Sequence, residues 1–470
     1  MCVKRIVIPV SNVLRDLHGD VLLAVTLARR GFTTYLVPTR RLREIFAIAP
    51  DMLLLHQFRV NQEDFTRKLL DCGMQVSVLD VEGMEQIDKY ARMTARDGDL
   101  KRRIKRFMTW GTVVAEFLKT GGGYSADQVM ITGSPRHDFY VEPLRRASLH
   151  VNGHAAKIPQ PMILINANFP YANHPTARAG SDAASKEGES LGIKDLLLEE
   201  KEQQTVAMRH MVEIANTLAA RFPQATVVYR PHPFEDLDTY KMLLDARENL
   251  QLIREGSVDG WILRASAVIQ RACTTAVESA LAGVPTLSPR WFDARDYPVP
   301  ESVSVPAGSM DALIQQVEQA LNRRMVTPES VREQVAAVTH DWFYCMDGRS
   351  HERVATVLAN DAKDADGANI RACLTELYRL DRDIRGTRSK IARQMRYWLR
   401  LSAETGDQYE RRETNVNAAV RRFMPDEVEM WINAINAAQQ MPNDVRARAM
   451  RRTDVIAPMQ TYHTVVVEPT

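Results

Sequence analysis

Several short segments of the sequence place charged or hydroxyl side chains where an apolar, strand-like run ends. The first is Tyr229-Arg230-Pro231-His232-Pro233, which follows the apolar run ATVVY. Its two prolines stiffen a turn that would hold Arg230 and His232 in fixed directions. A guanidinium and an imidazole at such a turn can bind a phosphate and stabilise charge on a leaving group. The alternative is a rigid strand-to-helix turn in which His232 only caps the next helix.

The second segment runs through Cys273-Thr274-Thr275 into a predicted helix that carries Glu278. Thr274 or Thr275 would be the N-cap, and the free N–H groups and positive dipole end of the helix would favour a donor phosphate. Glu278, one turn into the helix, would accept hydrogen bonds from ribose hydroxyls. Thr and Glu at this spacing also form an ordinary capping box, so a purely structural role explains them as well. Cys273 is expected to pack.

Two carboxylates follow a third predicted strand, in the segment LDVEG. Asp80 and Glu82 predict a general base or a nucleophile in a cleft. They share a face only where the strand continues, so one of the two would otherwise cap a turn.

Two further segments complete the candidate site. In TGSPRHD, Arg136 is either an anion ligand or the ion-pair partner of Asp138. In ILINANF, Asn166 and Asn168 stand where another strand reaches the same cleft. The sequence shows no HxxxH, no acidic metal-binding run and no P-loop lysine, so no metal and no cofactor beyond a nucleotide ligand is implied.

The elements that must position these segments alternate between short strands and helices of about ten residues, which predicts parallel sheets with crossover helices. The predicted strands are Lys4–Val10, Phe32–Val37, Gln75–Leu79, Gln128–Thr132, Met162–Ile165, Ala225–Tyr229, Leu250–Arg254, Ala267–Gln270, Pro285–Ser288 and, near the end of the chain, Thr464–Val467. The predicted helices are Asp20–Arg30, Asp64–Leu70, Gly111–Lys119, Glu202–Arg221, Glu235–Ala246, Thr274–Ala282, Met310–Asn322 and a stretch after His351. Tyr171–Gly192 is predicted to be a long polar loop.

This order predicts an α/β protein with two doubly wound, Rossmann-like domains that face a cleft, with ligands beyond the carboxyl ends of the strands. We expect the first domain, which would bind the molecule that accepts a transferred group, to span residues 1–150. The second domain, which would bind the nucleotide-activated donor of that group, is expected to span residues 151–362. Residues 363–470 are expected to form a helical extension. Within it, 371–400 contain nine Lys/Arg and three Asp/Glu. Ile384, Ile391, Met395 and Trp398 would share one face of a helix there. That helix either packs on the body or contacts an anionic membrane or a partner.

The composition narrows the class of protein. The chain has 470 residues, which predicts two or three domains. Lys plus Arg is 61 and Asp plus Glu is 59, a net charge of +2 that gives no support for nucleic-acid binding. Five scattered cysteines without a CxxC pair favour a reducing compartment over disulfides or structural zinc. With no apolar stretch suited to a signal peptide or a membrane span, we expect a cytoplasmic protein, peripheral at most to the inner membrane.

The order of the segments is more specific than any one of them. GSPRHD, INANF, RPHP and CTTAVESALAGVP, in this sequence order, resemble bacterial surface-carbohydrate biosynthesis proteins, which are similar to GT-B glycosyltransferases. The resemblance includes Arg15-Asp16 and Asp347-Gly348 and covers about residues 1–360. The RPHP and Thr-rich turns are also similar to those of transferases that use CMP-activated ulosonic acids (Kdo, sialic acid) and of CDP-glycerol polymer synthases.

The resemblance implies a metal-independent GT-B glycosyltransferase that moves a sugar, Kdo or a related ulosonic acid, from a CMP donor to a capsule or lipopolysaccharide acceptor. It implies that His232, Thr274 and Thr275 bind the donor phosphate and that Glu82 is the acid–base residue. Arg136 and Arg230 become phosphate or carboxylate ligands. The relatives tend to have two adjacent acids before the glycine, whereas Val81 separates them here. The alternatives are a CDP-glycerol-type polyol phosphate transferase, a sugar-nucleotide epimerase on the same scaffold, and a partner subunit that binds no nucleotide.

Overall fold

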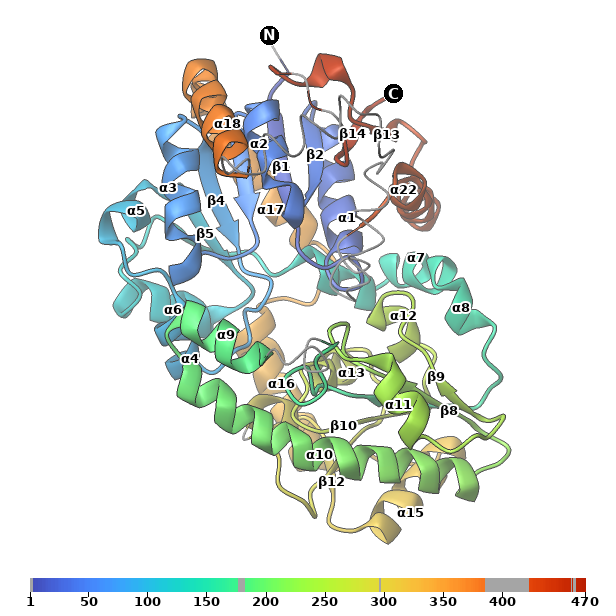
Figure 1. Ribbon diagram of the computed structural model, residues 1–470. Helices are drawn as coiled ribbons and strands as arrows, with labels where there is room; N and C mark the ends of the chain where they lie inside the picture. Colours follow the sequence, from blue (N-terminus) through green and yellow to red (C-terminus); the bar gives the residue numbers. More distant parts are fainter. Residues whose placement is uncertain (1–2, 176–181, 296, 385–421, 458, 460–461) are drawn as a thin grey trace, which may run out of the picture.

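The computed structural model describes residues 3–175, 182–295, 297–384, 422–457, 459 and 462–470. Two β-sheets lie at opposite ends of the molecule, and the chain crosses between them more than once (Figure 1). Helices flank both sheets, so the expected class of two doubly wound α/β domains facing a cleft is confirmed.

The first sheet has eight strands in the order β13-β14-β2-β1-β3-β4-β5-β6. The strands are β1 Arg5–Val10, β2 Thr33–Pro38, β3 Met52–Leu55, β4 Gln75–Leu79, β5 Arg106–Thr109, β6 Val129–Ile131, β13 Val445–Ala449 and β14 Val465–Pro469. β1 to β6 are parallel, and successive residues of β1 face opposite cores. Ile6 and Ile8 pack in one core and Val7 in the other, as the two-residue period of a strand requires.

The second sheet has six parallel strands in the order β12-β11-β10-β7-β8-β9. The strands are β7 Met162–Asn166, β8 Thr226–Arg230, β9 Leu250–Leu252, β10 Ala267–Gln270, β11 Thr286–Pro289 and β12 Val305–Ala307. β7, β8 and β10 are adjacent, so the segments that follow them emerge side by side at one edge of the sheet. Three of the five motif segments are therefore brought together by topology alone.

The helices connect and cover these strands. Those of the first half are α1 Leu17–Ala28, α2 Leu42–Ile48, α3 Glu63–Asp71, α4 Ile87–Met93, α5 Gly98–Arg103, α6 Thr112–Thr120, α7 Leu144–Val151 and α8 Gly153–Ala156, with a 3-10 turn, η3, at Pro135–Tyr140. Those of the second half are α9 Ala183–Leu191, α10 Lys194–Arg221, α11 Leu237–Leu243, α12 Val258–Ile262, α13 Thr275–Leu281, α14 Pro298–Ser302 and α15 Met310–Leu321. The remaining ones are α16 Glu329–Phe343, α17 Ser350–Asp361, α18 Ile370–Ile384 and α22 Pro425–Gln439. Among the described residues, none of these helices combines the length and apolar character that a bilayer crossing needs.

Several of the sequence predictions differ from the structure; strands β5 and β12, for example, were not predicted. The loop predicted over Tyr171–Gly192 contains α9, whose Asp182 N-cap accepts the backbone N–H of Ser185. β3 was not predicted because its four apolar residues follow the apolar end of α2 almost directly, and periodicity cannot separate two such short runs. The end of the chain is not wholly helical. β13 and β14 form a hairpin that adds to β2 as antiparallel strands.

The hairpin escaped prediction in part because β13 alternates small residues with arginine. Arg446 and Arg448 project from β13 toward Glu468 of β14, at 2.8 and 2.9 Å, so the charges pair across the ladder. α22 packs against α1 and α7, and α17 packs against α1, so these two described helices cover the first sheet on the side of α1. The apolar face predicted from Ile384, Ile391, Met395 and Trp398 lies outside the described side chains.

The contact between α6 and α16 depends on a glycine. A Cβ on Gly111, the N-cap of α6, would lie 2.3 Å from the Asp341 carbonyl oxygen and 2.4 Å from the Trp342 carbonyl carbon. Because backbone atoms cannot yield as a side chain can, Gly111→Ala is expected to destabilise the fold by about 3 kcal/mol in urea unfolding. Gly153→Ala is the matched control: a Cβ there meets nothing within 4 Å, and unfolding should shift by less than about 1 kcal/mol. Equal stability of the two variants would contradict the packing argument.

Candidate functional site

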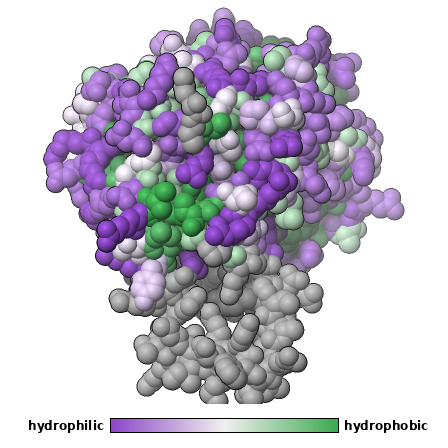
Figure 2. All heavy atoms as spheres, turned by 90° about the horizontal axis from the view of Figure 1, so that it is seen from above, coloured by the Kyte–Doolittle hydropathy of each residue, from purple (hydrophilic) through white to green (hydrophobic). Residues whose placement is uncertain are grey.

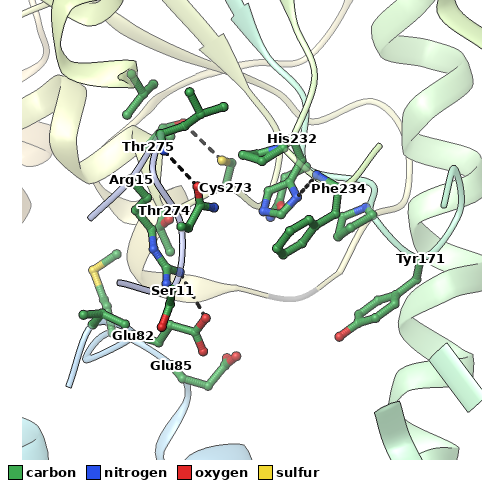
Figure 3. Close-up of a pocket in the computed structure, with 18 of the residues that line it drawn as sticks. Ser11, Arg15, Glu82, Glu85, Tyr171, His232, Phe234, Cys273, Thr274 and Thr275 are labelled. Carbon is green, nitrogen blue, oxygen red and sulfur yellow. Dashed lines mark hydrogen bonds and ion pairs between the residues drawn. The ribbon is translucent and has the colours of Figure 1, made fainter. Parts of the chain in front are cut away.

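A cavity of about 700 Å³ lies between the two sheets. Its walls are the segments that follow β1 and β4 of the first sheet and β7, β8 and β10 of the second. All five strands are parallel members of their sheets and present their carboxyl ends to the cavity, which is where open α/β sheets bind ligands. Figure 3 shows the side chains that converge there.

Of the residues predicted from the sequence, all but one line this cavity. Those that line it are Glu82, Arg136, Asn168, Arg230, His232, Thr274, Thr275 and Glu278. The exception is Asp80, which is 2% exposed and lies behind the wall. Its carboxylate accepts the backbone N–H of Glu82 at 2.8 Å and the hydroxyl of Tyr90 at 2.6 Å. Burial raises the pKa of Asp80, and the carboxyl acts on the cavity only by fixing the turn that carries Glu82.

Glu82 is held between two arginines. Its carboxylate accepts Arg15 Nη1 at 3.1 Å and also bonds to Arg59 Nη2. Desolvation in the cleft opposes ionisation, but the charges of Arg59 and Arg15 hold the pKa of Glu82 well below its usual range. A carboxylate paired in this way is a weak base until one arginine leaves it. Arg59 belongs to the site and was missed by the sequence analysis, because nothing in its local sequence marks it.

Arg15 is a first-half cation whose charge acts on the second half. Its Nε donates to Asp16 at 2.8 Å, and the charge of Arg15 contributes to the lowered pKa of His232. Figure 3 shows the Arg15 guanidinium directed at Glu82, and Thr274 lines the same cavity. Asp16 and Glu82 therefore fix a guanidinium at the cavity wall.

His232 is a neutral hydrogen-bond donor in this structure. Its Nδ1 accepts the backbone N–H of Phe234 at 3.3 Å, which assigns the ring proton to Nε2. Burial, with the charge of Arg15, lowers the pKa of His232 to about 4, so the ring is uncharged at neutral pH. Figure 3 shows the ring at the cavity wall beside Phe234. The prediction that the prolines hold this histidine at the cleft is thus matched by its position.

The turn after β10 is shaped by side chains from β7. Asn166 Nδ2 donates to Thr275 Oγ1 at 3.1 Å, and Asn168 Nδ2 donates to the Ala272 carbonyl at 3.1 Å. Ala272 has a φ of +52°, a conformation that costs energy for a non-glycine residue and is held here by these contacts. The N-cap residue Thr274 forms no side-chain cap hydrogen bond. With Thr274 as the N-cap, the N3 residue is Val277, so the predicted capping box of a threonine with Glu278 does not form, and Thr274 lines the cavity.

The two predicted arginine ligands are bonded to protein groups. Arg136 Nη2 lies 3.3 Å from Glu278, and its guanidinium lies 4.8 Å from the centre of the Trp110 ring. Arg230 Nη1 donates to the Glu255 carbonyl at 2.9 Å, and burial lowers the pKa of Arg230 to about 10. Both arginines thus brace the cavity: Arg136 ties the first half to α13, and Arg230 holds the loop after β9.

The pairing of Arg136 with Asp138 is also wrong. Asp138 instead accepts the backbone N–H groups of Ser350 and His351 at 3.0 and 2.9 Å, and the ring Nδ1 of His351 lies 2.8 Å from it. A carboxylate at the first turn of α17 satisfies donors that the helix itself cannot. Asp138 therefore holds the start of α17 in place against the first half.

A second set of ion pairs joins the two halves at the opposite wall. Arg295 pairs with Glu85 and lies 3.1 Å from Glu200, while Lys89 lies 3.1 Å from both of those carboxylates. Tyr297 donates its hydroxyl to the Met84 carbonyl at 2.7 Å. Glu85 and Lys89 follow β4, whereas Glu200 is on α10 and Arg295 follows β11. The walls of the cavity are therefore held at a defined separation by charges from both halves.

Among the residues that the structure describes, no three His, Cys, Asp or Glu side chains are grouped as a metal ion would require.

No protein-family model matches the chain, and no curated protein matches it. Solved structures resemble its fold. The UDP-GlcNAc 2-epimerase of Methanocaldococcus jannaschii in complex with UDP-GlcNAc and UDP has 12% identity and a TM-score of 0.47, over 76% of this chain and 99% of its own. The UDP-GlcNAc 2-epimerase of Neisseria meningitidis has 13% identity and a TM-score of 0.47, and the match covers 76% of this chain and 99% of the epimerase. The wall teichoic acid polymerase TagF has 10% identity and a TM-score of 0.47, and the match covers 77% of this chain and 89% of the polymerase. At these identities the likeness concerns the fold.

Proposed function

We propose that this protein is an enzyme that binds a nucleotide-activated carbohydrate or polyol in the cavity between its two halves and transfers the activated group. The observation that carries the proposal is the meeting of Arg15 from the first half with His232 and Thr274 from the second across one cavity. A guanidinium, an imidazole N–H and a hydroxyl, converging from two sheets, match the donors that a phosphate needs.

In the proposed reaction these donors stabilise the leaving phosphate. The bond from the phosphate oxygen to the anomeric carbon breaks, and the electron pair stays on that oxygen, beside Arg15 and His232 Nε2. The acceptor hydroxyl oxygen forms the new bond to the anomeric carbon and gives up its proton. Glu82 is the proposed base. Because an arriving phosphate competes with Glu82 for Arg15, binding of the donor would raise the basicity of this carboxylate.

The donor proposed from the sequence resemblance is a CMP-activated ulosonic acid, and the acceptor a bacterial surface glycan or glycolipid. The epimerases and the polymerase reported above act on other substrates, so UDP-sugars and CDP-glycerol are tested beside it. Isothermal calorimetry with CMP, CDP and UDP is expected to show one nucleotide binding at least tenfold more tightly than the others. Binding of none of them would overturn the proposal.

Product analysis separates the reaction types. A glycosyl transfer releases the free nucleotide and adds the mass of the sugar to the acceptor. A CDP-glycerol-type transfer breaks the bond on the other side of a phosphorus and adds glycerol phosphate. An epimerase changes the donor with no acceptor present, and that outcome would replace transfer as the activity of the site.

Contact with an anionic membrane is part of the proposal for the acceptor. On α18, Ile370, Leu374 and Tyr378 are 53%, 41% and 71% exposed at a spacing of four residues. Seen from above, the end of the molecule that carries α18 shows an apolar area among hydrophilic side chains (Figure 2). The sequence that follows, 385–400, contains six Lys/Arg and no Asp/Glu, and it lies outside the described residues. An apolar stripe beside a basic segment is typical of interfacial binding.

The membrane contact is tested by flotation with lipid vesicles. The protein is expected to float with vesicles containing phosphatidylglycerol and not with pure phosphatidylcholine. Leu374→Asp is expected to reduce the bound fraction at least fivefold, since a charge replaces an apolar anchor. Arg102→Asp, on the exposed surface of α5, is the control for a general charge effect. Equal losses in both variants would contradict the role of α18.

A further inference from the structure

One fully buried carboxyl joins the two loops that carry Asn168 and His232. Glu235 is 0% exposed. Its Oε1 accepts the backbone N–H of Phe169 at 3.0 Å and that of His232 at 2.8 Å, and its Oε2 bonds to the hydroxyl of Tyr240. The first loop follows β7 and the second follows β8, so a single side chain fixes the spacing between neighbouring segments of the cavity wall.

Other contacts tie the same loops, but they are made by groups that do not titrate near neutral pH. The Ala167 N–H donates to the Arg230 carbonyl at 2.9 Å, and the Asp236 N–H donates to the Asn173 carbonyl at 2.8 Å. Arg254 Nη1 reaches the Glu235 carbonyl oxygen at 3.3 Å. The loops therefore have a scaffold of backbone hydrogen bonds, to which Glu235 adds two bonds from one ionisable group.

The groups that face this carboxyl come from five segments of the chain. They are Tyr229 of β8, Tyr240 of α11, His232 of its own loop, Arg254 after β9 and Cys273 after β10. Among the described residues, no cation lies within ion-pair distance of the Glu235 carboxylate. Burial, opposed only in part by the hydrogen bonds, raises the pKa of Glu235 to about 7.

Protonation of Glu235 leaves its hydrogen bonds to the two loops intact. In the neutral acid, Oε1 remains a carbonyl oxygen that accepts both backbone N–H groups, and the acid hydroxyl at Oε2 donates to the Tyr240 oxygen. The two forms of Glu235 thus hold the loops in the same way and differ in charge. The charge matters because the carboxylate lies directly behind His232, the residue whose Nε2–H faces the cavity.

We propose that Glu235 is a positioning residue that takes up a proton when an anionic phosphate binds beside His232, so that ligand binding is coupled to protonation. The inference rests on the proposed function, because it needs a phosphate at that place. A bound phosphate and an ionised Glu235 would both carry negative charge in one desolvated region. Their repulsion favours the protonated, neutral form of Glu235. Glu235 is not expected to touch the ligand. It acts through the loops that it spaces and through its charge.

The direction of the effect follows from linkage. The ligand prefers the protonated form, so the pKa of Glu235 rises on binding and affinity falls as the pH increases above about 7. If binding raises that pKa by about one unit, affinity at pH 8.5 is about sevenfold weaker than at pH 6, and about half a proton is taken up at pH 7.5. His232, with its pKa of about 4, does not titrate in this range.

The experiment uses calorimetry of the full chain with three probes whose phosphates do not titrate between pH 6 and 8.5: UDP-N-acetylglucosamine, CDP-glycerol and a CMP-activated sugar. With any probe that binds, wild-type affinity is measured at pH 6 and 8.5, and proton uptake at pH 7.5 from two buffers of different ionisation enthalpy. Glu235→Gln keeps a carbonyl for the two N–H groups and an N–H for Tyr240, but it cannot titrate. It is expected to bind equally at both pH values, with no proton uptake.

A second variant separates the effect of the hydrogen bonds that Glu235 accepts from the effect of its charge. Glu235→Ala removes the acceptor of both loops and is expected to bind at least tenfold more weakly than Glu235→Gln at every pH. Asp236→Asn, a carboxyl on the next residue, is the control and should keep the wild-type pH dependence. Wild-type affinity that does not change with pH, or the same pH dependence in Glu235→Gln, would overturn the inference alone. Failure of all three probes to bind would overturn the proposed function with it.

Discussion

Replacement of His232 by alanine is expected to slow the proposed transfer about 100-fold while leaving the protein folded. The imidazole is neutral and donates from Nε2, and a donor aimed at charge that develops on a leaving oxygen contributes about 3 kcal/mol to the transition state. Binding of the ground-state donor should weaken less, because the phosphate oxygen gains charge as its bond breaks. The expected result is therefore a fall in kcat that exceeds the change in KM.

The measurement is steady-state turnover of the donor that binds in calorimetry, with the thermal unfolding of each variant recorded beside it. His232→Gln is the informative control, since its amide N–H can reach the region of Nε2 and should recover part of the rate. Phe234→Leu retains the backbone N–H that fixes the imidazole tautomer and should cost less than fivefold. A His232→Ala variant with full turnover would remove this residue from the mechanism.

Strand ends explain why most of the candidate site could be predicted from sequence. In a parallel sheet every carboxyl end faces the same edge, so polar residues directly after apolar runs must gather there. Residues 230, 232, 274 and 278 were found on this basis, and the cavity includes them all. The rule locates a side chain at the wall but does not state its partner, and Arg136 and Arg230 proved to be bonded to the protein.

What escaped prediction depends on contacts between distant segments. Arg59 enters the site because the Glu82 carboxylate lies beside it, and Glu235 is buried only because α11 and the β7 loop close over it. Asp80 and Glu82 could not be distinguished by spacing. The strand ends at Leu79, so the turn that follows points one carboxylate inward and the other into the cavity. Such outcomes are set by tertiary packing, which overrides local pattern.

Removal of the Glu278 carboxylate is expected to destabilise the protein by about 3–5 kcal/mol. Glu278 and Arg136 side chains are each 9% exposed, and they join α13 of the second half to η3 of the first. With Glu278→Ala, Asp16, at 3.9 Å, is the carboxylate partner that the described residues leave to the Arg136 guanidinium, and a buried charge that loses its closer carboxylate is strongly destabilising. Urea unfolding measures the loss.

The pH dependence of the same pair has a defined sign. Burial opposes ionisation of Glu278, but the neighbouring His137, at 3.7 Å, and the charge of Arg136 lower its pKa below its usual value of 4.5. Its contribution to stability is therefore present above about pH 4.5 and is lost as the pH falls through the lower, folded-state value. The stability of Glu278→Gln should vary less with pH in this range than that of the wild type.

A double variant decides between a structural and a ligand-binding role for Glu278. Arg136→Met with Glu278→Leu replaces the ion pair by apolar groups of similar size and is expected to recover most of the stability that Glu278→Ala loses. If Glu278 also accepts ribose hydroxyls, the double variant should remain folded and bind the nucleotide at least tenfold more weakly than the wild type. Full nucleotide affinity in the stable double variant would assign Glu278 to the junction of the two halves alone. Full stability in Glu278→Ala would contradict the ion-pair argument, because the buried Arg136 would then need no partner.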